Sequence, residues 1–238
     1  MAKKNKRIAI MQPGYLPWLG FFELMYNCDL FVFLDDVQYT KRDWRNRNRI
    51  RTYDGWQWLT VPVFNKNKRG QLIKDVQINN QVNWQKQHFN AFRVHYNKSR
   101  FFNSFIPELQ NIYSRRWKNL SGLNIELILL LAKILKILTP CIFSSQLNIK
   151  SKKSMRILEI CKELNANELY DSKAASNFLN LSLFGKEDIT VKFQNYVHPV
   201  YDQVYKPFIP YMSTIDLLFN YGEEASKIIL GKMSCSAV

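Results

Sequence analysis

The chain opens with two short apolar runs separated by a polar break and an amphipathic stretch. This pattern predicts a strand at Arg7–Met11, a helix at Trp18–Asn27 and a second strand at Asp29–Asp35. Short apolar runs bounded by turn signals are typical of strands buried in a parallel sheet. Two strands joined by a helix within roughly thirty residues favour a parallel pair.

Further along, the pattern predicts a hairpin and then a helical region. The hairpin strands are expected at Asn48–Thr52 and Gln57–Val63, because Asp54-Gly55 between them is a hairpin signal. The other expected elements are strands at Asp75–Ile78, Cys141–Leu147, Glu168–Tyr170 and Ile189–Tyr196, and helices at Val82–Tyr96, Phe105–Trp117, Leu120–Leu138, Met155–Leu164 and from Ser213 onward.

Strands that alternate with helices predict an α/β protein with a Rossmann-like, mostly parallel sheet, an inserted β-hairpin and a helical region. No internal repeat or low-complexity linker marks a boundary. We therefore expect a single α/β domain over residues 1–238, with a helix-rich portion around residues 82–138.

The charge balance favours an anionic partner. The 238 residues include 34 Lys and Arg against 19 Asp and Glu, a formal net charge of +15. Such an excess suits nucleic acid, a membrane face or a phosphorylated small molecule. The alternative is that an AT-rich genome supplies many of the lysines, which then only solvate the surface.

Cysteine spacing and hydropathy indicate a cytoplasmic protein without a membrane span. Cys28, Cys141, Cys161 and Cys235 show no CxxC spacing, so neither a disulfide framework nor a metal site is expected. The N-terminal segment has too short an apolar stretch for a signal peptide. The most apolar segment, Asn124–Leu138, contains charged residues and is too short to span a bilayer, so we expect a buried helix. No cofactor is expected.

Three polar clusters follow predicted strands. They are Gln12–Gly20, Asp35–Arg49 and Tyr170–Ser176. Ligands of open α/β sheets bind outside the carboxyl ends of the strands, so we expect these clusters to line a pocket. In the first cluster two prolines restrict the loop, and Gln12 and Trp18 are expected to shape the pocket wall. The alternative for Trp18 is packing in the core.

The second cluster is strongly basic. Six basic residues and one acid lie between Lys41 and Arg51, a balance of +5. Arginines alternate at positions 45, 47, 49 and 51, so on an extended segment they project from one face. Guanidinium groups suit phosphate or carboxylate oxygens, and such a row can also follow a nucleic-acid backbone. The alternative is an edge strand that charge protects against aggregation.

Few side chains suit acid–base chemistry. Asp35 and Asp36 are adjacent at a strand end, so they are expected to point to opposite sides, one as a base or amine ligand and one paired with an arginine. His198 follows a strand and is a candidate acid or base. The alternative is that it anchors the loop before Pro199. His88 is a candidate for the pocket. No serine lies in a nucleophile elbow, and covalent catalysis is the weaker option.

Several long motifs resemble the WbqC-like protein family, and the resemblance covers nearly the whole chain. They are "MQPGYLPWLGFFELMYNCDLFVFLDDVQYTKRDWRNRNRI", "WLTVPV" and "VHPVYDQVYKPFIPYMSTIDLLFNYG". The family pattern is matched by Gln12, Pro13, Leu16, Pro17, Trp18, Gly20, Asp35, Asp36, Gln38, Lys41, Arg47, Asn48, His198, Pro199, Tyr201, Gln203, Ser213 and Asp216. One departure lies at Asp171–Leu179, where family members more often show a glycine-containing stretch and a tyrosine.

The resemblance implies a role in bacterial O-antigen, lipopolysaccharide or other surface-polysaccharide biosynthesis. Some family members carry names that suggest glycyl or other acyl transfer to an amino sugar. We therefore expect a transferase that moves an acyl or aminoacyl group to a nucleotide-linked amino sugar. Its expected catalytic residues are Asp35, Asp36 and His198, and its expected substrate-binding residues are Gln12, Trp18, Gln38, Lys41, Arg47, Asn48, His88, Tyr201 and Gln203.

Two alternatives use the basic charge differently. One is a non-catalytic RNA-binding protein built around the charge of +15. The other is an aminoacyl transferase that takes its donor from tRNA. A nucleotide sugar or another phosphorylated small molecule is the expected partner, with tRNA as a further candidate.

Overall fold

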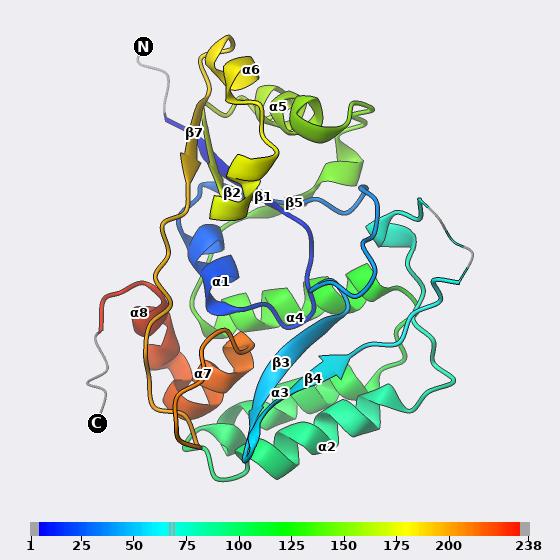
Figure 1. Cartoon of the computed structure of the whole chain (residues 1–238), viewed down its shortest axis with the longest axis vertical. Helices are drawn as coiled ribbons and strands as arrows, with labels where there is room; N and C mark the ends of the chain where they lie inside the picture. Colours follow the sequence, from blue (N-terminus) through cyan, green and yellow to red (C-terminus); the bar gives the residue numbers. More distant parts are fainter. Residues whose placement is uncertain (1–4, 67, 69, 234–238) are drawn as a thin grey trace. The chain divides into compact units, whose positions relative to one another are not determined.

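The computed structural model describes residues 5–66, 68 and 70–233, which form two compact units (Figure 1). The first, called the sheet unit, consists of the described residues within Met1–Gln12, Glu23–Val37 and Leu138–Val197. The second, called the hairpin unit, consists of those within Pro13–Phe22, Gln38–Ile137 and His198–Val238. One of the points where the chain passes from one unit to the other falls inside helix α1, Leu19–Tyr26. The single domain expected from the sequence stays a prediction.

The sheet unit contains five parallel strands. Their order in the sheet is β5-β2-β1-β6-β7. The strands are β1 (Arg7–Met11), β2 (Leu30–Phe33), β5 (Cys141–Phe143), β6 (Glu168–Asp171) and β7 (Thr190–Phe193). β1 and β2 pair in parallel from Ile8 opposite Leu30, which confirms the predicted strand–helix–strand pair.

Apolar side chains on the strands and on α5 (Lys153–Glu163) build the core of this unit. Ile8 and Leu169 from the sheet pack with Ile160 and Cys161 from the helix, all fully buried. The short helix α6 (Leu181–Gly185) adds Phe184. Strands in a parallel sheet are commonly covered on both faces, which explains why they read as continuous apolar runs in the sequence.

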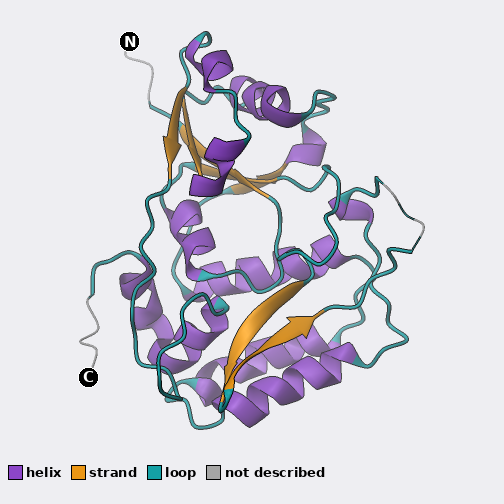
Figure 2. Ribbon diagram, viewed as in Figure 1, coloured by secondary structure: helices purple, strands orange, loops and turns teal. Residues whose placement is uncertain are grey.

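The hairpin unit joins a two-stranded antiparallel sheet to several helices (Figure 2). Its strands are β3 (Arg47–Thr52) and β4 (Gly55–Thr60). The helices are α2 (Trp84–Tyr96), α3 (Phe102–Ser114), α4 (Leu120–Ile134), α7 (Thr214–Tyr221) and α8 (Ala225–Ile229). Gly55 has a φ of 145°, which glycine adopts most readily and which explains its place in the turn.

These elements confirm the predicted α/β class, parallel sheet, hairpin and helical region. One predicted strand is absent, and several predicted boundaries differ from the observed ones. Residues 75–78 make isolated bridges to different partners and form no strand, because Gln77 pairs with Asn119 and Ile78 with Val63. The strand from Cys141 ends at Phe143, where a 3₁₀ turn begins. The helix from Leu120 ends at Ile134, and Lys136 then has a positive φ of 59°.

Among the described residues, no helix is both long enough and apolar enough to cross a membrane. The apolar segment at Asn124–Leu138 mostly forms α4, with Leu127, Ile128 and Leu131 fully buried, as predicted. Cys235 lies outside the described residues, and the other three cysteines are free thiols.

Candidate functional site

The strand order of the sheet unit defines a topological switch point. From β1 the chain adds β2 and β5 on one side of the sheet, and later adds β6 and β7 on the other. Ligands of open α/β sheets bind outside the carboxyl ends of the strands where the order reverses. In this sheet the reversal lies between β1, which is followed by Gln12, and β6, which ends at Asp171.

Asp171 is the last residue of β6 and lies at that end of the sheet. It is 5% exposed, and its Oδ1 accepts a hydrogen bond of 2.6 Å from the backbone N–H of Ser172. Burial raises the pKa of the Asp171 carboxyl to about 7, although the hydrogen bonds from Ser172 oppose the rise. A carboxyl group that is partly ionised at neutral pH can both accept and release a proton there.

The thiol nearest to Asp171 does not favour covalent chemistry. Burial, with a contribution from Asp171, raises the pKa of Cys161 to about 12. Burial also raises the pKa of Cys28 to about 12 and that of Cys141 to about 11. The nucleophilic form of cysteine is the thiolate, so these three thiols are poor nucleophiles at neutral pH.

A second carboxylate near β6 is held by several donors. Glu23 accepts hydrogen bonds from Tyr170 Oη at 3.0 Å and from Asn27 Nδ2 at 2.6 Å, both to Oε1, while Gln194 Nε2 donates to Oε2. Burial, followed by the charge of Glu23, raises the pKa of Tyr170. With its carboxylate engaged by three side chains, Glu23 fixes the end of α1 against β6 and the residue after β7.

Asp35 and Asp36 lie together at the end of β2, but not as predicted. Ser144 Oγ donates to Oδ1 of both, at 3.2 Å for Asp35 and 2.5 Å for Asp36, so the two side chains converge. The expected opposite directions were wrong because β2 ends at Phe33, and strand alternation does not continue to these residues. Asp36 pairs with Arg156, and Asp35 also accepts from the backbone and hydroxyl of Ser145.

In the hairpin unit, His198 stacks between two other candidate residues. Its ring centroid lies 6.3 Å from that of Trp18 and 6.2 Å from that of Tyr201. Nδ1 lies 2.8 Å from the carbonyl oxygen of Pro199, and Nε2 accepts from the backbone N–H of Tyr211 at 3.1 Å. Burial lowers the pKa of His198. This arrangement favours loop anchoring, and a role as acid or base stays a prediction.

Tyr201 and Gln203 serve a buried carboxylate on α7. Tyr201 Oη and Gln203 Nε2 each donate to Oδ2 of Asp216 at 2.8 Å, and Tyr96 Oη donates to Oδ1 at 2.9 Å. Asp216 is fully buried. Ser213 caps the same helix, since its Oγ accepts from the backbone N–H of Ile215 at 3.4 Å. These contacts give the His-Pro-x-Tyr-x-Gln and Ser-x-x-Asp motifs a clear structural role.

The loop that holds Trp18 is fixed by two other candidate residues. Asn48 Nδ2 donates to the carbonyl oxygen of Leu16 at 2.6 Å, and Leu16 has a positive φ of 45°. His88 Nδ1 lies 2.7 Å from Tyr15 Oη, which also contacts the hydroxyl of Tyr113. Burial lowers the pKa of His88 to about 4, so this imidazole is neutral at physiological pH. These contacts therefore fix the backbone conformation of the loop that precedes Trp18.

The remaining candidates lie near the hairpin. Gln38 and Lys41 are exposed, and Gln38 bridges to Leu72 through the backbone. Arg47 lies over the ring of Trp58, with its guanidinium carbon 4.3 Å from the centroid. The predicted residues thus fall into several groups, and Asp171 was missing from the predicted set. Its only signal was the position of the cluster Tyr170–Ser176 after a strand.

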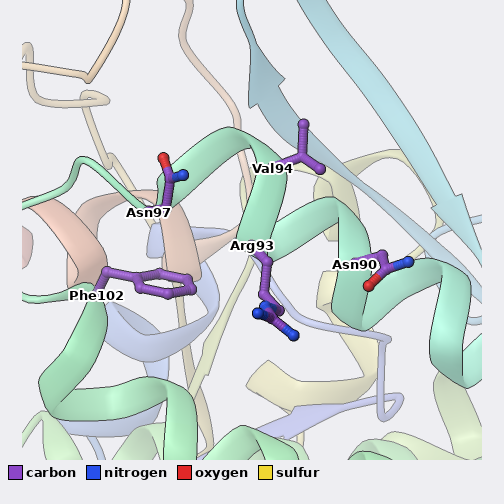
Figure 3. Close-up of a pocket in the computed structure, with 5 residues that line it drawn as sticks. All are labelled: Asn90, Arg93, Val94, Asn97 and Phe102. Atoms are coloured by element: carbon purple, nitrogen blue, oxygen red, sulfur yellow. The ribbon is translucent and has the colours of Figure 1, made fainter.

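A hollow of about 550 Å³ opens on the hairpin unit between α2 and the start of α3 (Figure 3). Asn90, Arg93, Val94, Asn97 and Phe102 line it. None of these side chains is a carboxylate, thiol or imidazole, so the hollow contains no candidate acid or base. In the part of the chain that the structure describes, no group of three His, Cys, Asp or Glu side chains is placed to hold a metal ion.

The fold is that of an α/β protein with a Rossmann-like parallel sheet. The strand order gives it a candidate ligand site at the switch point. Residues 12–228 match the WbqC-like protein family, so the chain belongs to that family. The uncharacterized protein Rv1507c of Mycobacterium tuberculosis is 36% identical over 222 residues, which cover 92% of this chain and 96% of the relative. No solved structure matches the chain.

Proposed function

We propose that this protein is a cytoplasmic transferase that moves an acyl or aminoacyl group to a nucleotide-linked amino sugar in bacterial surface-polysaccharide biosynthesis. The observation that carries the proposal is the position of Asp171 at the switch point of the sheet, with a pKa of about 7. Membership of the WbqC-like family supports the same pathway. An amine acceptor must lose a proton during acyl transfer, and a carboxylate at this position is suited to take it.

The proposed reaction balances as a simple acyl substitution. The amine nitrogen of the sugar attacks the carbonyl carbon of a thioester or ester donor, and an N–C bond forms as the C–S or C–O bond breaks. The Asp171 carboxylate accepts the proton of the amine, and the departing thiolate or alkoxide is protonated in turn. We propose that Gln12, which follows β1, orients the acceptor by hydrogen bonds.

The geometry shifts the proposed base from the predicted residues to Asp171. Asp36 is engaged by Arg156 and Ser144, and His198 uses both ring nitrogens in contacts with the backbone. In contrast, Ser172 is the only residue that donates hydrogen bonds to Asp171 among the described residues. It donates from its backbone N–H and its hydroxyl. Phosphate binding by Lys41 and Arg47, and sugar orientation by Gln38 and Asn48, stay predictions.

The direct test is incubation with UDP- or dTDP-linked amino sugars and a panel of acyl-coenzyme A and aminoacyl donors, followed by mass spectrometry. We expect a mass gain equal to the acyl group on one acceptor. Asp171→Asn should lower turnover by roughly 10²–10⁴-fold, the usual contribution of a general base. Asp202→Asn, an exposed carboxylate paired with Lys206, is the matched control and should leave turnover unchanged. If no acceptor in the panel gains mass and none binds, the transferase proposal is refuted.

A further inference from the structure

One face of the hairpin combines arginines with tryptophans. In the antiparallel register Arg47 lies opposite Thr60, Arg49 opposite Trp58 and Arg51 opposite Trp56. Side chains directly opposite each other in such a pair share one face of the sheet. The alternation predicted from the sequence for these three arginines is therefore confirmed by the pairing.

Three indoles form a contiguous group on this face. The centroid of Trp58 lies 5.3 Å from that of Trp44 and 5.5 Å from that of Trp56. Trp44 and Trp56 are each 42% exposed. A cluster of large aromatic side chains at a surface marks an interaction site more often than isolated exposed residues do. We call Trp44, Arg47, Arg49, Trp56 and Trp58 the tryptophan–arginine surface.

The two arginines of this surface are stacked on the indoles. The guanidinium carbon of Arg47 lies 4.3 Å from the Trp58 centroid, and that of Arg49 lies 5.0 Å from the Trp56 centroid. Stacking of this kind uses the flat face of a guanidinium and leaves its N–H groups at the edge. Arg51 differs, because it is 1% exposed and donates to the carbonyl oxygens of the turn and of Pro207.

Most N–H groups of the stacked arginines have no acceptor among the residues that the structure describes. A guanidinium has five N–H donors. Arg47 Nη2 donates to the carbonyl oxygen of Arg42 at 2.6 Å, and Arg49 Nη2 donates to that of Tyr211 at 3.1 Å. Within the described residues no carboxylate pairs with either one, since Asp43 pairs with Arg45. In the part of the chain that the structure describes, two positive charges therefore remain without a carboxylate counter-ion beside exposed indoles.

We propose that the tryptophan–arginine surface binds single-stranded nucleic acid. Its exposed indoles offer planes on which bases stack, and its guanidinium edges offer donors to phosphate oxygens. Charge complementarity selects this occupant, because the segment from Lys41 to Arg51 has a balance of +5 within a chain of net charge +15. A charged edge that only prevents aggregation has no need of two half-exposed tryptophans beside the arginines.

The proposal is tested by fluorescence anisotropy with a labelled single-stranded RNA of about 12 nucleotides, a length within the range that single binding modules cover. We expect saturable binding that weakens as salt rises from about 50 to 200 mM, because phosphate contacts release counter-ions. Trp56→Ala should weaken binding by roughly 5- to 100-fold through the loss of one stacking plane. Trp56→Phe, which keeps an aromatic plane, should restore most of the affinity.

Arg47→Gln tests the charge separately. It should weaken binding and reduce the slope of log affinity against log salt by about 1. Two matched controls use residues that are not part of the tryptophan–arginine surface. Arg115→Ala removes a guanidinium that is also stacked on an indole, 4.7 Å from the centroid of Trp117. Phe178→Ala removes an aromatic ring that is 62% exposed in the sheet unit. Both should bind RNA as the parent protein does.

Three outcomes would overturn the proposal. They are no binding at the lowest salt, equal affinity for a blunt duplex of the same sequence, and Trp56→Ala and Arg47→Gln variants that bind as tightly as the controls. Melting curves of each variant identify loss of fold, and Arg47→Gln supplies the test if Trp56→Ala unfolds. The proposal goes beyond the transferase, because it uses none of the residues around Asp171. Failure of the transfer assay and failure of RNA binding are therefore separate results.

Discussion

Aspartates lie at the carboxyl ends of two strands of the same parallel sheet, and they differ in the hydrogen-bond donors around them. At the end of β2, Asp35 and Asp36 receive donors from Ser144, Ser145 and Arg156. At the end of β6, Asp171 is buried to a similar extent as Asp35 but receives hydrogen bonds from Ser172 alone, among the described residues.

The difference shows that identical side chains at the carboxyl ends of the strands can have different functions, depending on their donors. A carboxylate with several donors, one of them an arginine, is stabilised as a charge and serves structure. A buried carboxylate loses its hydrogen bonds to water, and few protein donors do not fully replace them. Its pKa therefore rises into the range useful for proton transfer. The kind of donor separates the two groups, since Asp36 pairs with an arginine whereas Asp171 receives neutral donors from Ser172, among the described residues.

The largest expected effect is on the β2 side. Asp36→Ala leaves Arg156 buried without its carboxylate, and its remaining acceptors among the described residues are the carbonyl oxygens of Ile149 and Ser151. Breaking a buried ion pair in this way typically costs about 3–5 kcal/mol, which urea unfolding would measure as a lower free energy of unfolding. The exposed pair of Asp202 and Lys206 is the control, and Asp202→Ala should cost at most about 1 kcal/mol. Equal losses for the two variants would show that the β2 network is not structural.

The second effect is a pH dependence of stability to which Asp171 should contribute. Its folded-state pKa of about 7 lies above the unfolded value of about 3.9, so between these values the folded state holds a proton that the unfolded state has lost. This group's contribution to the free energy of unfolding therefore falls as pH rises from about 4 to about 7, by at most about 4 kcal/mol.

Asp171→Asn should abolish that fall, because an amide does not titrate. The measurement is urea unfolding of the parent and the variant at several pH values, with the difference between the two proteins plotted against pH. The variant should gain stability relative to the parent as pH rises through this window. A difference that stays constant with pH would mean that Asp171 is ionised normally in the folded protein.

A smaller effect is expected from a single donor to Asp35. Ser145→Ala removes the hydroxyl that donates to Oδ2 at 2.8 Å and keeps the backbone N–H that donates to Oδ1. Loss of one hydrogen bond to a charged group should cost about 1.5–3 kcal/mol in unfolding free energy. Ser176→Ala, whose exposed hydroxyl donates only to a backbone carbonyl, is the control and should change stability by less than about 0.5 kcal/mol.

The smallest effect sharpens the β6 side. The hydroxyl of Ser172 lowers the pKa of Asp171 by hydrogen bonding, although less than burial raises it. Ser172→Ala should therefore move the titration of Asp171 further above about 7 while the backbone N–H remains in place. Carbon-13 NMR of labelled aspartate reports the midpoint directly. A midpoint that moves to lower pH would contradict this account of the site.

Local patterns were sufficient for the fold. The first strand was predicted at Arg7–Met11 and is found there, because a strand buried in a parallel sheet is a short apolar run with clear ends. The hairpin followed from Asp54-Gly55, since few other sequences favour such a turn. Alternation along β3 likewise placed Arg47 and Arg49 on one face.

The candidate site depends on contacts that no local pattern contains. Asp171 lies at the switch point only because β6 pairs with β1, more than 150 residues earlier in the chain. Arg51 shares the alternation of its neighbours but is buried through a hydrogen bond to Pro207. The backbone N–H of Tyr211 donates a hydrogen bond to Nε2 of His198, a ring that was expected to act as an acid or base. In each case a distant partner determines what the side chain can do.

The chain crosses between its two units several times, and this has a consequence for synthesis. Each unit consists of three separate segments, and each needs one that the ribosome makes late. The sheet unit lacks β6 and β7 until Phe193 has emerged, and the hairpin unit lacks α7 until Tyr221 has emerged. Domains made of one continuous segment can fold as soon as they leave the ribosome. Here most of the polypeptide must be made before either core closes, so a product truncated before Phe193 leaves both cores incomplete.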